Sequence, residues 1–157
     1  MNRQEFVRLV EGSQVSLRRF LASLCSGDVE LAEDIAQEVY IKAFLACDSL
    51  SAEENFNAWV TKIAYNTFLN NVRRQRINLP IEDARGNESD LKADSVFKYE
   101  NLYQALSQLP LRDRTAITLF YLEGYSTKEI SKIIDIKEDA VRQILVRGRR
   151  RLKILIS

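Results

Sequence analysis

Apolar residues recur every three or four positions along most of the chain, and no segment alternates between apolar and polar residues as a strand does. In the first half, this spacing predicts one or two helices that end near Gly27 and a helix at about 30–47 capped by Asp28. After a polar stretch at 48–55, a long helix is predicted at about 56–76. These elements indicate a small helical bundle.

The helical periodicity is lost between residues 77 and 100. Pro80, Gly86 and six acidic residues predict a flexible acidic linker there. The linker separates two expected domains, at 1–76 and 101–157. Because the whole chain holds only five Gly and two Pro, its composition favours helices over a sandwich or a barrel. We therefore predict an all-α protein made of two small helical domains.

In the second domain, turn residues separate short helices. Pro110 and Gly124 divide its first part, and helices are expected at about 101–109 and 116–122. The helical pattern then resumes and runs to the end of the chain.

The end of the chain has the pattern of a helix-turn-helix. Ser126 and Glu129 form a capping box that opens a short helix. Asp135 and Ile136 make the turn, and Glu138 then begins the last helix with negative charge where the helix dipole favours it. The apolar residues of the two helices are spaced so that they can pack together: Ile130, Ile133, Ile134, Ile136, Val141, Ile144 and Leu145.

The last helix is strongly basic, with six basic and no acidic residues from Ala140 to Ser157. In a helix-turn-helix the second helix lies in the major groove. The outward positions expected to contact base edges are Arg142, Gln143, Val146 and Arg147. The residues expected to contact phosphates are Arg149, Arg150 and Lys128. The alternative is a solvated basic helix at the end of a bundle.

Charge distribution favours nucleic-acid binding by the second domain. The whole chain carries a net charge of only +1, whereas residues 101–157 carry eleven basic and six acidic side chains. The first domain has a net charge of −1 and the linker one of −3. The positive charge therefore coincides with the helix-turn-helix.

The sequence offers little for catalysis or metal binding. It has no histidine, and two cysteines without histidine cannot form an ordinary zinc site. Cys25 and Cys47 are expected to be free buried thiols in a reducing cytosol. No nucleophile–base pair, phosphate-binding glycine loop or metal-ligand cluster is visible, so we expect no enzymatic activity, metal or cofactor. No apolar run reaches membrane-spanning length, and a cytoplasmic protein is expected.

Two polar faces mark the first domain. On the helix at 30–47, Asp34, Gln37 and Glu38 share one face, which taken alone is typical of a solvated surface. On the helix at 56–76, a face opposite the apolar stripe combines an aromatic ring, amides and cations: Trp59, Lys62, Asn66, Asn70 and Arg73. Such a face suits single-stranded DNA, because rings stack on bases and cations neutralise phosphates. The alternative is that Trp59 belongs to the core and the asparagines are ordinary surface.

Together the two halves resemble a known family. The segments AEDIAQEVYIKAF and NAWVTKIAYNTFLNNVRRQR precede the acidic linker, and LSQLPLRDRTAITLFYLEGYSTKEISKIIDIKEDAVRQILVRGRRRL follows it. In this order they are similar to regions two and four of the extracytoplasmic-function (group IV) sigma factors of bacterial RNA polymerase, within the sigma-70 family. Nearly the whole chain takes part in the resemblance.

The resemblance implies partners and roles. Asp34, Gln37 and Glu38 match the surface that docks on the β′ clamp helices of core polymerase, and the β flap is a further expected contact. The residues that match the part that melts and binds the minus-ten element are Leu50, Trp59, Lys62, Asn66, Asn70, Arg73 and Arg74. Asn66 and Asn70 match the pocket for a flipped base, with Leu50 in the loop before it. Arg142, Gln143 and Arg147 match the base contacts to the minus-thirty-five element. An anti-sigma factor is an expected partner.

A different class of function stays open at this stage. A stand-alone transcriptional regulator would also carry a C-terminal helix-turn-helix, with the first domain serving dimerisation or sensing. It predicts a symmetric dimer and a palindromic site. A helical protein-interaction module is the third possibility.

Overall fold

The structure, a computed structural model, describes residues 2–50, 55–78 and 100–156. Throughout these ranges the regular structure is helical, which confirms the predicted all-α class. Most of the expected acidic linker, 79–99, lies outside the described residues.

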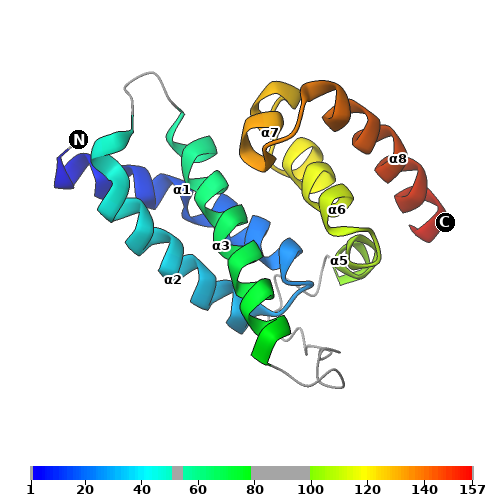
Figure 1. Ribbon diagram of the computed structural model, residues 1–157, viewed down its shortest axis with the longest axis horizontal. Helices are drawn as coiled ribbons and strands as arrows, with labels where there is room; N and C mark the ends of the chain where they lie inside the picture. Colours follow the sequence, from blue (N-terminus) through cyan, green and yellow to red (C-terminus); the bar gives the residue numbers. More distant parts are fainter. Residues whose placement is uncertain (1, 51–54, 79–99, 157) are drawn as a thin grey trace.

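Three long helices form an N-terminal bundle, seen on the left of Figure 1. A single helix replaces the one or two expected before Gly27, with Asn2 accepting a hydrogen bond from the Glu5 backbone N–H at its start. Asp28 caps the second helix as predicted, by accepting from the Leu31 N–H at 3.1 Å. The elements are α1 (Arg3–Leu24), α2 (Val29–Ala46), a 3₁₀ turn η1 (Cys47–Ser49) and α3 (Phe56–Asn78).

The core of this bundle follows the predicted apolar stripes. Each fully buried aliphatic or aromatic side chain contributes about 1.5–3 kcal/mol through removal of its surface from water. The side chains at its centre include Leu17, Phe20, Leu21, Ile35, Val39, Val60 and Ala64.

The C-terminal bundle, on the right of Figure 1, differs from the prediction at its second helix. We expected a helix at about 116–122, but α6 begins at Leu111, directly after Pro110, and continues into a π turn. The first turn of α6 contains the polar residues Arg112, Asp113 and Arg114, so the spacing of apolar residues did not predict it. The elements are α5 (Glu100–Ser107), α6 (Leu111–Ile117), η3 (Thr118–Leu122), α7 (Thr127–Ile134) and α8 (Glu138–Ile156).

The helix-turn-helix is formed as predicted. The Ser126 side chain accepts from the Glu129 N–H at 3.1 Å, and the Glu129 carboxylate accepts from the Ser126 N–H at 2.9 Å. Asp135 ends α7 in the left-handed conformation, at φ 58°, which an Asp side chain tolerates. The predicted apolar residues between α7 and α8 are buried, apart from the half-buried Ile136.

Gly148 lets α8 approach α6 closely. A Cβ atom at this position would lie 3.0 Å from Cγ1 of Ile117. A glycine inside a helix costs about 0.5–1 kcal/mol relative to alanine, and here it permits contact between the two helices.

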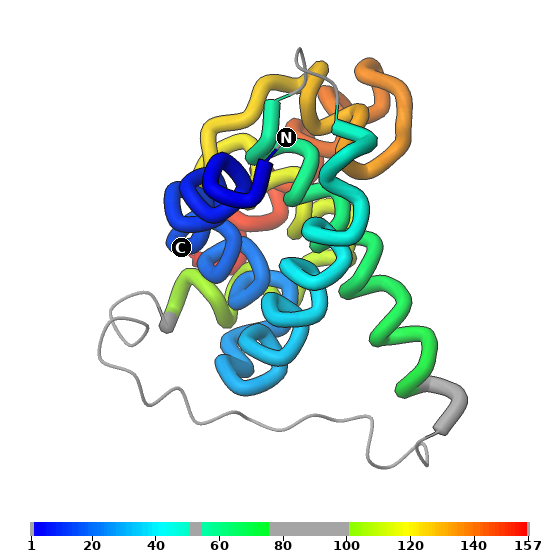
Figure 2. Tube along the Cα trace, turned by 90° about the vertical axis from the view of Figure 1, so that its left-hand side faces the viewer, coloured from blue at the N-terminus to red at the C-terminus, as the bar shows by residue number. Residues whose placement is uncertain are grey.

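The two bundles pack against each other. Figures 1 and 2 show α1 and α3 of the N-terminal bundle beside the C-terminal bundle. Contacts join α1 to α5, α6 and η3, and α3 to α7. Nothing in the sequence predicted this packing.

Candidate nucleic-acid interface

The outer surface of α8 presents the expected cationic face. Arg142, Gln143, Val146, Arg149 and Arg150 are all exposed, while the opposite face of the helix is buried on α6 and α7. The structure therefore places these predicted DNA-contacting residues on one accessible helix. With N–H donors on three arginines and an amide, such a face can bond both to phosphates and to base edges.

Arg142 sits at the start of α8 in a small polar network. Its guanidinium donates to Glu138 and to Asp139, each at 2.9 Å. Glu138 also accepts from the Thr127 hydroxyl at 2.6 Å, which links the start of α7 to the start of α8. The network holds Arg142 on the outer face, although its exposed ion pairs are worth only about 0.2–1 kcal/mol each.

Arg147 is exposed, as expected, but its guanidinium is bound to a buried carboxylate. Its Nη2 donates to Oδ1 of Asp113 at 2.7 Å and its Nε to Oδ2 at 3.2 Å. Asp113 on α6 is fully buried and also accepts from Arg151 at 3.0 Å. These hydrogen bonds raise the pKa of Arg147, which stays charged. A base contact by Arg147 would require this bidentate pair to break, so its base-reading role stays a prediction.

The three predicted phosphate ligands are all exposed. Arg149 donates to the Tyr121 hydroxyl at 2.8 Å, and Tyr121 is itself exposed. Arg150 and Lys128 are both exposed, one on α8 and the other in the first turn of α7. Tyr121 was not among the residues predicted to bind DNA, because nothing in its spacing distinguishes it from a core aromatic.

The polar face of α3 is present in the structure. We call Trp59, Lys62, Asn66, Asn70 and Arg73 the α3 face. Lys62, Asn66, Asn70 and Arg73 are exposed. Trp59 is half-buried and packs on Phe56, with ring centroids 5.8 Å apart, so it is both a core contact and part of the surface.

Leu50 is half-buried just after η1, and Arg74 is exposed on α3. The Arg74 guanidinium lies 3.8 Å from the Glu38 carboxylate, so α3 and α2 are linked at this point. Residues 51–54, which join Leu50 to α3, are outside the described residues. The arrangement of a base pocket in that loop is therefore not described.

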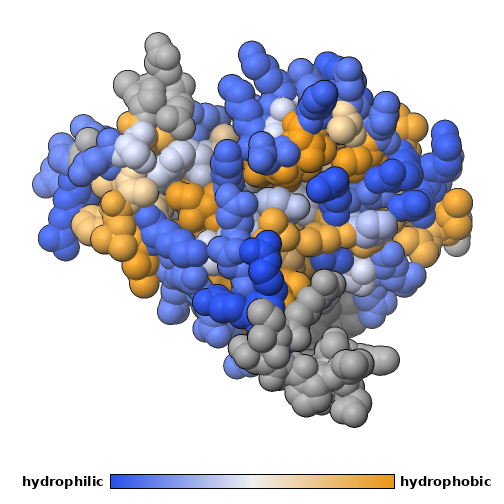
Figure 3. Space-filling view, in the orientation of Figure 1, coloured by the Kyte–Doolittle hydropathy of each residue, from blue (hydrophilic) through white to orange (hydrophobic). Residues whose placement is uncertain are grey.

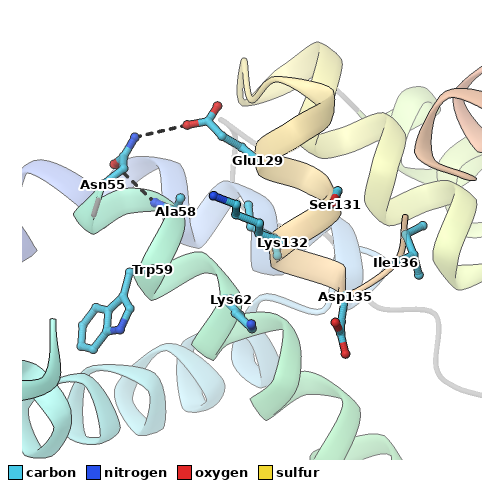
Figure 4. A pocket seen from close by; sticks show the side chains of 10 residues that line it. Asn55, Ala58, Trp59, Lys62, Glu129, Ser131, Lys132, Asp135 and Ile136 are labelled. Atoms are coloured by element: carbon cyan, nitrogen blue, oxygen red, sulfur yellow. Dashed lines mark hydrogen bonds between the residues drawn. The ribbon is translucent and has the colours of Figure 1, made fainter. Parts of the chain in front are cut away.

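A cleft of about 790 Å³ lies between α7 and the N-terminal end of the α3 face (Figure 4). Trp59 and Lys62 line it from α3. From the helix-turn-helix, Glu129 and Lys132 line it together with Asp135. The Asn55 amide donates across the cleft to Glu129 at 3.5 Å. Only part of the α3 face is involved, since Asn66 and Asn70 do not line the cleft.

The surface of α2 extends beyond its three predicted polar residues. Asp34 and Gln37 are exposed, whereas Glu38 is half-exposed and pairs with Lys42 at 3.1 Å. One to two turns further along the same face, Ile41 and Leu45 are 63% and 77% exposed. Apolar side chains gather beside polar ones on the left of Figure 3, over the N-terminal bundle. In the sequence, Ile41 and Leu45 are apolar residues that lie outside the buried stripe of α2, and this was the signal that could have indicated the larger surface.

The two cysteines are free, as expected. Cys25 is buried, and this burial raises the pKa of its thiol to about 12. Cys47 is only half-buried. Over the described ranges no group of three His, Cys, Asp or Glu side chains is placed to hold a metal ion. Nor does any helix of this part of the chain have the length and apolar character to cross a bilayer.

Comparisons with known proteins match both bundles. The family model for sigma-70 region 2 covers residues 9–77, and that for sigma-70 region 4 covers residues 99–152. The ECF RNA polymerase sigma factor SigM of Bacillus subtilis is 34% identical over 144 residues, covering 88% of this chain and 87% of SigM. The ECF RNA polymerase sigma-E factor of Escherichia coli is 34% identical over 139 residues, covering 79% and 71%.

A solved structure agrees with these matches. The sigma factor RpoE of Bartonella quintana, solved in complex with the anti-sigma factor NepR, superposes with a TM-score of 0.88 at 26% identity. The match covers 98% of this chain and 97% of RpoE, so it includes both bundles. Two regions in the same order, on one chain of nearly the same length, leave a single family: the protein is a member of the ECF sigma factors of RNA polymerase.

Proposed function

We propose that this protein binds core RNA polymerase, brings it to promoters and opens the DNA there, with the work divided between its two bundles. The observation that carries the proposal is the pairing of two different nucleic-acid surfaces on one chain. The α8 surface suits intact duplex, and the α3 face suits exposed bases. A regulator that binds only duplex DNA would not need the second surface.

The upstream contact is assigned to α8. Arg142, Gln143 and Val146 are exposed near its start, where a recognition helix meets base edges. Arg149, Arg150 and Lys128 supply phosphate contacts that set its register. Arg147 joins these base contacts only if DNA displaces Asp113.

The minus-ten contact is assigned to the α3 face together with Leu50 and Arg74. Asn66 and Asn70 have exposed amides that can bond to an extruded base. Lys62, Arg73 and Arg74 are cations close enough along the helix to follow the backbone of one strand. Capture of a flipped base favours the open state because it stabilises only unpaired DNA.

The polymerase contact is assigned to α2. Asp34 and Gln37 supply polar groups, Glu38 adds a partly paired carboxylate, and Ile41 and Leu45 supply exposed apolar surface. A mixed surface of this kind fits a helical partner with basic and apolar residues. The clamp helices of β′ are the proposed partner, with the β flap contacting the C-terminal bundle.

An anti-sigma factor is a further proposed partner. The support is the match over 98% of the chain to a sigma factor bound by such a protein. The protein would act in the cytoplasm, where polymerase and promoters lie.

Gel filtration with core polymerase and transcription in vitro test the proposal. We expect a one-to-one complex and discrete start sites on a genomic library. Asp34→Arg should weaken the complex at least tenfold, because it places a cation on the docking surface. Glu11→Arg, the same charge change at an exposed position on α1, is the matched control. A stable dimer that never joins the polymerase would instead support the regulator hypothesis.

A further inference from the structure

The carboxylate of Asp113 binds two arginines of the last helix. It accepts from Nη2 and Nε of Arg147 at 2.7 and 3.2 Å, and from Nη1 of Arg151 at 3.0 Å. The Asp113 side chain has no exposed surface, whereas the side chains of Arg147 and Arg151 are 51% and 46% exposed. The carboxylate is thus shielded from solvent, while both guanidinium groups are partly open to it. We call Asp113, Arg147 and Arg151 the α8 cluster.

A close approach of α8 to α6 makes the α8 cluster possible. The two helices run side by side in Figure 1 and are in contact. A Cβ atom on Gly148 would lie 3.0 Å from Cγ1 of Ile117 and 3.7 Å from Cβ of Asp113. Because Gly148 directly follows Arg147, the arginine extends from backbone that already lies close to the buried carboxylate. The packing of the two helices therefore builds the cluster.

The charge of Asp113 offsets the repulsion between the two arginines. Arg147 and Arg151 are four residues apart on one helix, a spacing at which like charges destabilise each other. The carboxylate binds both of them and holds them at one place. Because two guanidinium groups outweigh one carboxylate, the α8 cluster stays cationic. It can therefore attract an anion, although a buried carboxylate lies behind the arginines.

Both arginines keep N–H donors for a ligand. The contact of Arg147 with Asp113 uses Nε and Nη2, and its Nη1 donates to none of the described residues. Arg151 uses Nη1, and its Nη2 and Nε are without a partner in the same part of the chain. Guanidinium groups bind phosphates through pairs of N–H groups. The donors that remain can therefore bond to the oxygens of one phosphate while Asp113 stays paired.

The place of the α8 cluster along the helix favours a phosphate over a base edge. A recognition helix reads base edges with residues near its N-terminus. Arg142 lies in the second turn of α8, whereas Arg151 lies in the fourth. Arg147 lies between them in the third turn, and its pair with Asp113 would have to break before it reached a base. Because Arg147 and Arg151 share one carboxylate, both fit the backbone that flanks the groove.

We propose that Arg147 and Arg151 bind one phosphate group of promoter DNA, and that Asp113 is the positioning residue that assembles this site. The inference rests on the proposed promoter function and deepens its upstream contact. Arg147 thus becomes a phosphate ligand, and Arg151 becomes a second one beside it. Asp113 limits the number of base pairs that α8 reads, because it keeps Arg147 away from the base edges.

The first test removes each arginine in turn. Binding of the holoenzyme is measured on promoter duplexes in which each upstream base pair is changed, at several salt concentrations. Arg147→Ala and Arg151→Ala should each weaken binding about threefold to tenfold on every duplex, because a charged hydrogen bond to a phosphate is lost. Each should also reduce the salt dependence. Arg112→Ala, which removes an exposed arginine of α6, is the control and should change neither quantity.

Two results of this test would overturn the proposal. A loss confined to one base pair with Arg147→Ala would show that Arg147 reads a base while Asp113 holds it. An unchanged affinity with Arg151→Ala would remove the second ligand from the site. Failure of the promoter function gives a different result, because the parent holoenzyme would then bind all duplexes equally, and both proposals would fall.

The second test removes the positioning residue. Asp113→Asn keeps the size of the side chain but loses its charge, so it releases Arg147 from the bidentate pair. The released arginine should add a preference of about tenfold at one upstream base pair, and Arg147→Ala in the same background should abolish it. A holoenzyme that gains no preference would overturn the positioning role. Because the arginine variants keep Asp113, the first test decides the phosphate site even if Asp113→Asn does not fold.

Discussion

At the scale of single residues, a buried carboxylate decides which cations of α8 are free to contact DNA. Asp113 has no exposed side-chain surface and holds both Arg147 and Arg151. Displacing Arg147 would take one of two cationic partners from a buried carboxylate, and weakening the pairing of a buried charge is costly. Arg142 has only exposed partners, which a base contact can replace at little cost.

Arg142→Ala should weaken promoter binding by about 1–3 kcal/mol at one base pair, because a bidentate contact to a base edge is lost. The measurement is binding of the holoenzyme to promoters with each upstream base pair changed in turn. Arg150→Ala is the control, and its loss should be similar on every sequence and should reduce the salt dependence. If Arg142→Ala also weakened all sequences equally, the residue would be a phosphate ligand.

The two thiols should differ sharply in reactivity. With a pKa of about 12, Cys25 is a thiolate in only about one molecule in ten thousand at pH 8, and it is buried as well. We expect iodoacetamide at pH 8 to modify Cys47 in the folded protein and Cys25 only after unfolding in urea. Mass spectrometry of digests measures both rates. Comparable rates in the folded state would show that Cys25 is accessible.

At the scale of elements, local capping explains why the helix-turn-helix was predictable. The α7 helix spans only eight residues, and helices this short are marginal in isolation. The capping box at its start and the left-handed Asp135 at its end satisfy groups that would otherwise be unpaired. Its buried isoleucines then fix it against α8.

Ser126→Ala should reduce the free energy of unfolding by about 1 kcal/mol, since the Glu129 N–H loses its acceptor. Ser126→Asp, which keeps an acceptor oxygen, should restore most of this loss. Urea denaturation followed by circular dichroism gives both values. An alanine variant as stable as the parent would mean that water replaces the cap without cost.

At the scale of the whole molecule, the two bundles must serve different steps of one process. In the proposed function, duplex binding depends on α8 and strand opening depends on the α3 face. The chain between Asn78 and Glu100 could span up to about 70 Å if extended, a reach that suits two separated DNA elements.

Asn66→Ala should slow open-complex formation about tenfold while leaving upstream duplex binding nearly unchanged, because a contact made only with unpaired DNA is lost. Permanganate footprinting measures opening, and protection of the upstream element measures binding. Gln75→Ala, an exposed amide on the other side of α3, is the control. Unchanged rates on both duplex and pre-melted templates would remove Asn66 from the pocket.

The elements follow from local chemistry, so much of the fold could be predicted. Apolar spacing, Asp28, the capping box and Gly124 define helices through neighbours within a few residues, and the structure confirms these positions. The start predicted for α6 was wrong. Its first turn is polar and includes the buried Asp113, whose partners lie 34 and 38 residues away in the sequence. Residue type alone does not indicate that a carboxylate is buried.

By itself, the sequence determined the two helical bundles, their basic and polar faces and the family to which they belong, since each depends on spacing along one helix. Only the tertiary structure decided that Arg147 is held by Asp113, that Ile41 and Leu45 lie exposed beside the acidic face of α2, and that Glu123 meets Arg19 across 104 residues. The physical reason is that such contacts depend on how separate helices pack, and no periodicity within a helix records which side chain lies opposite it.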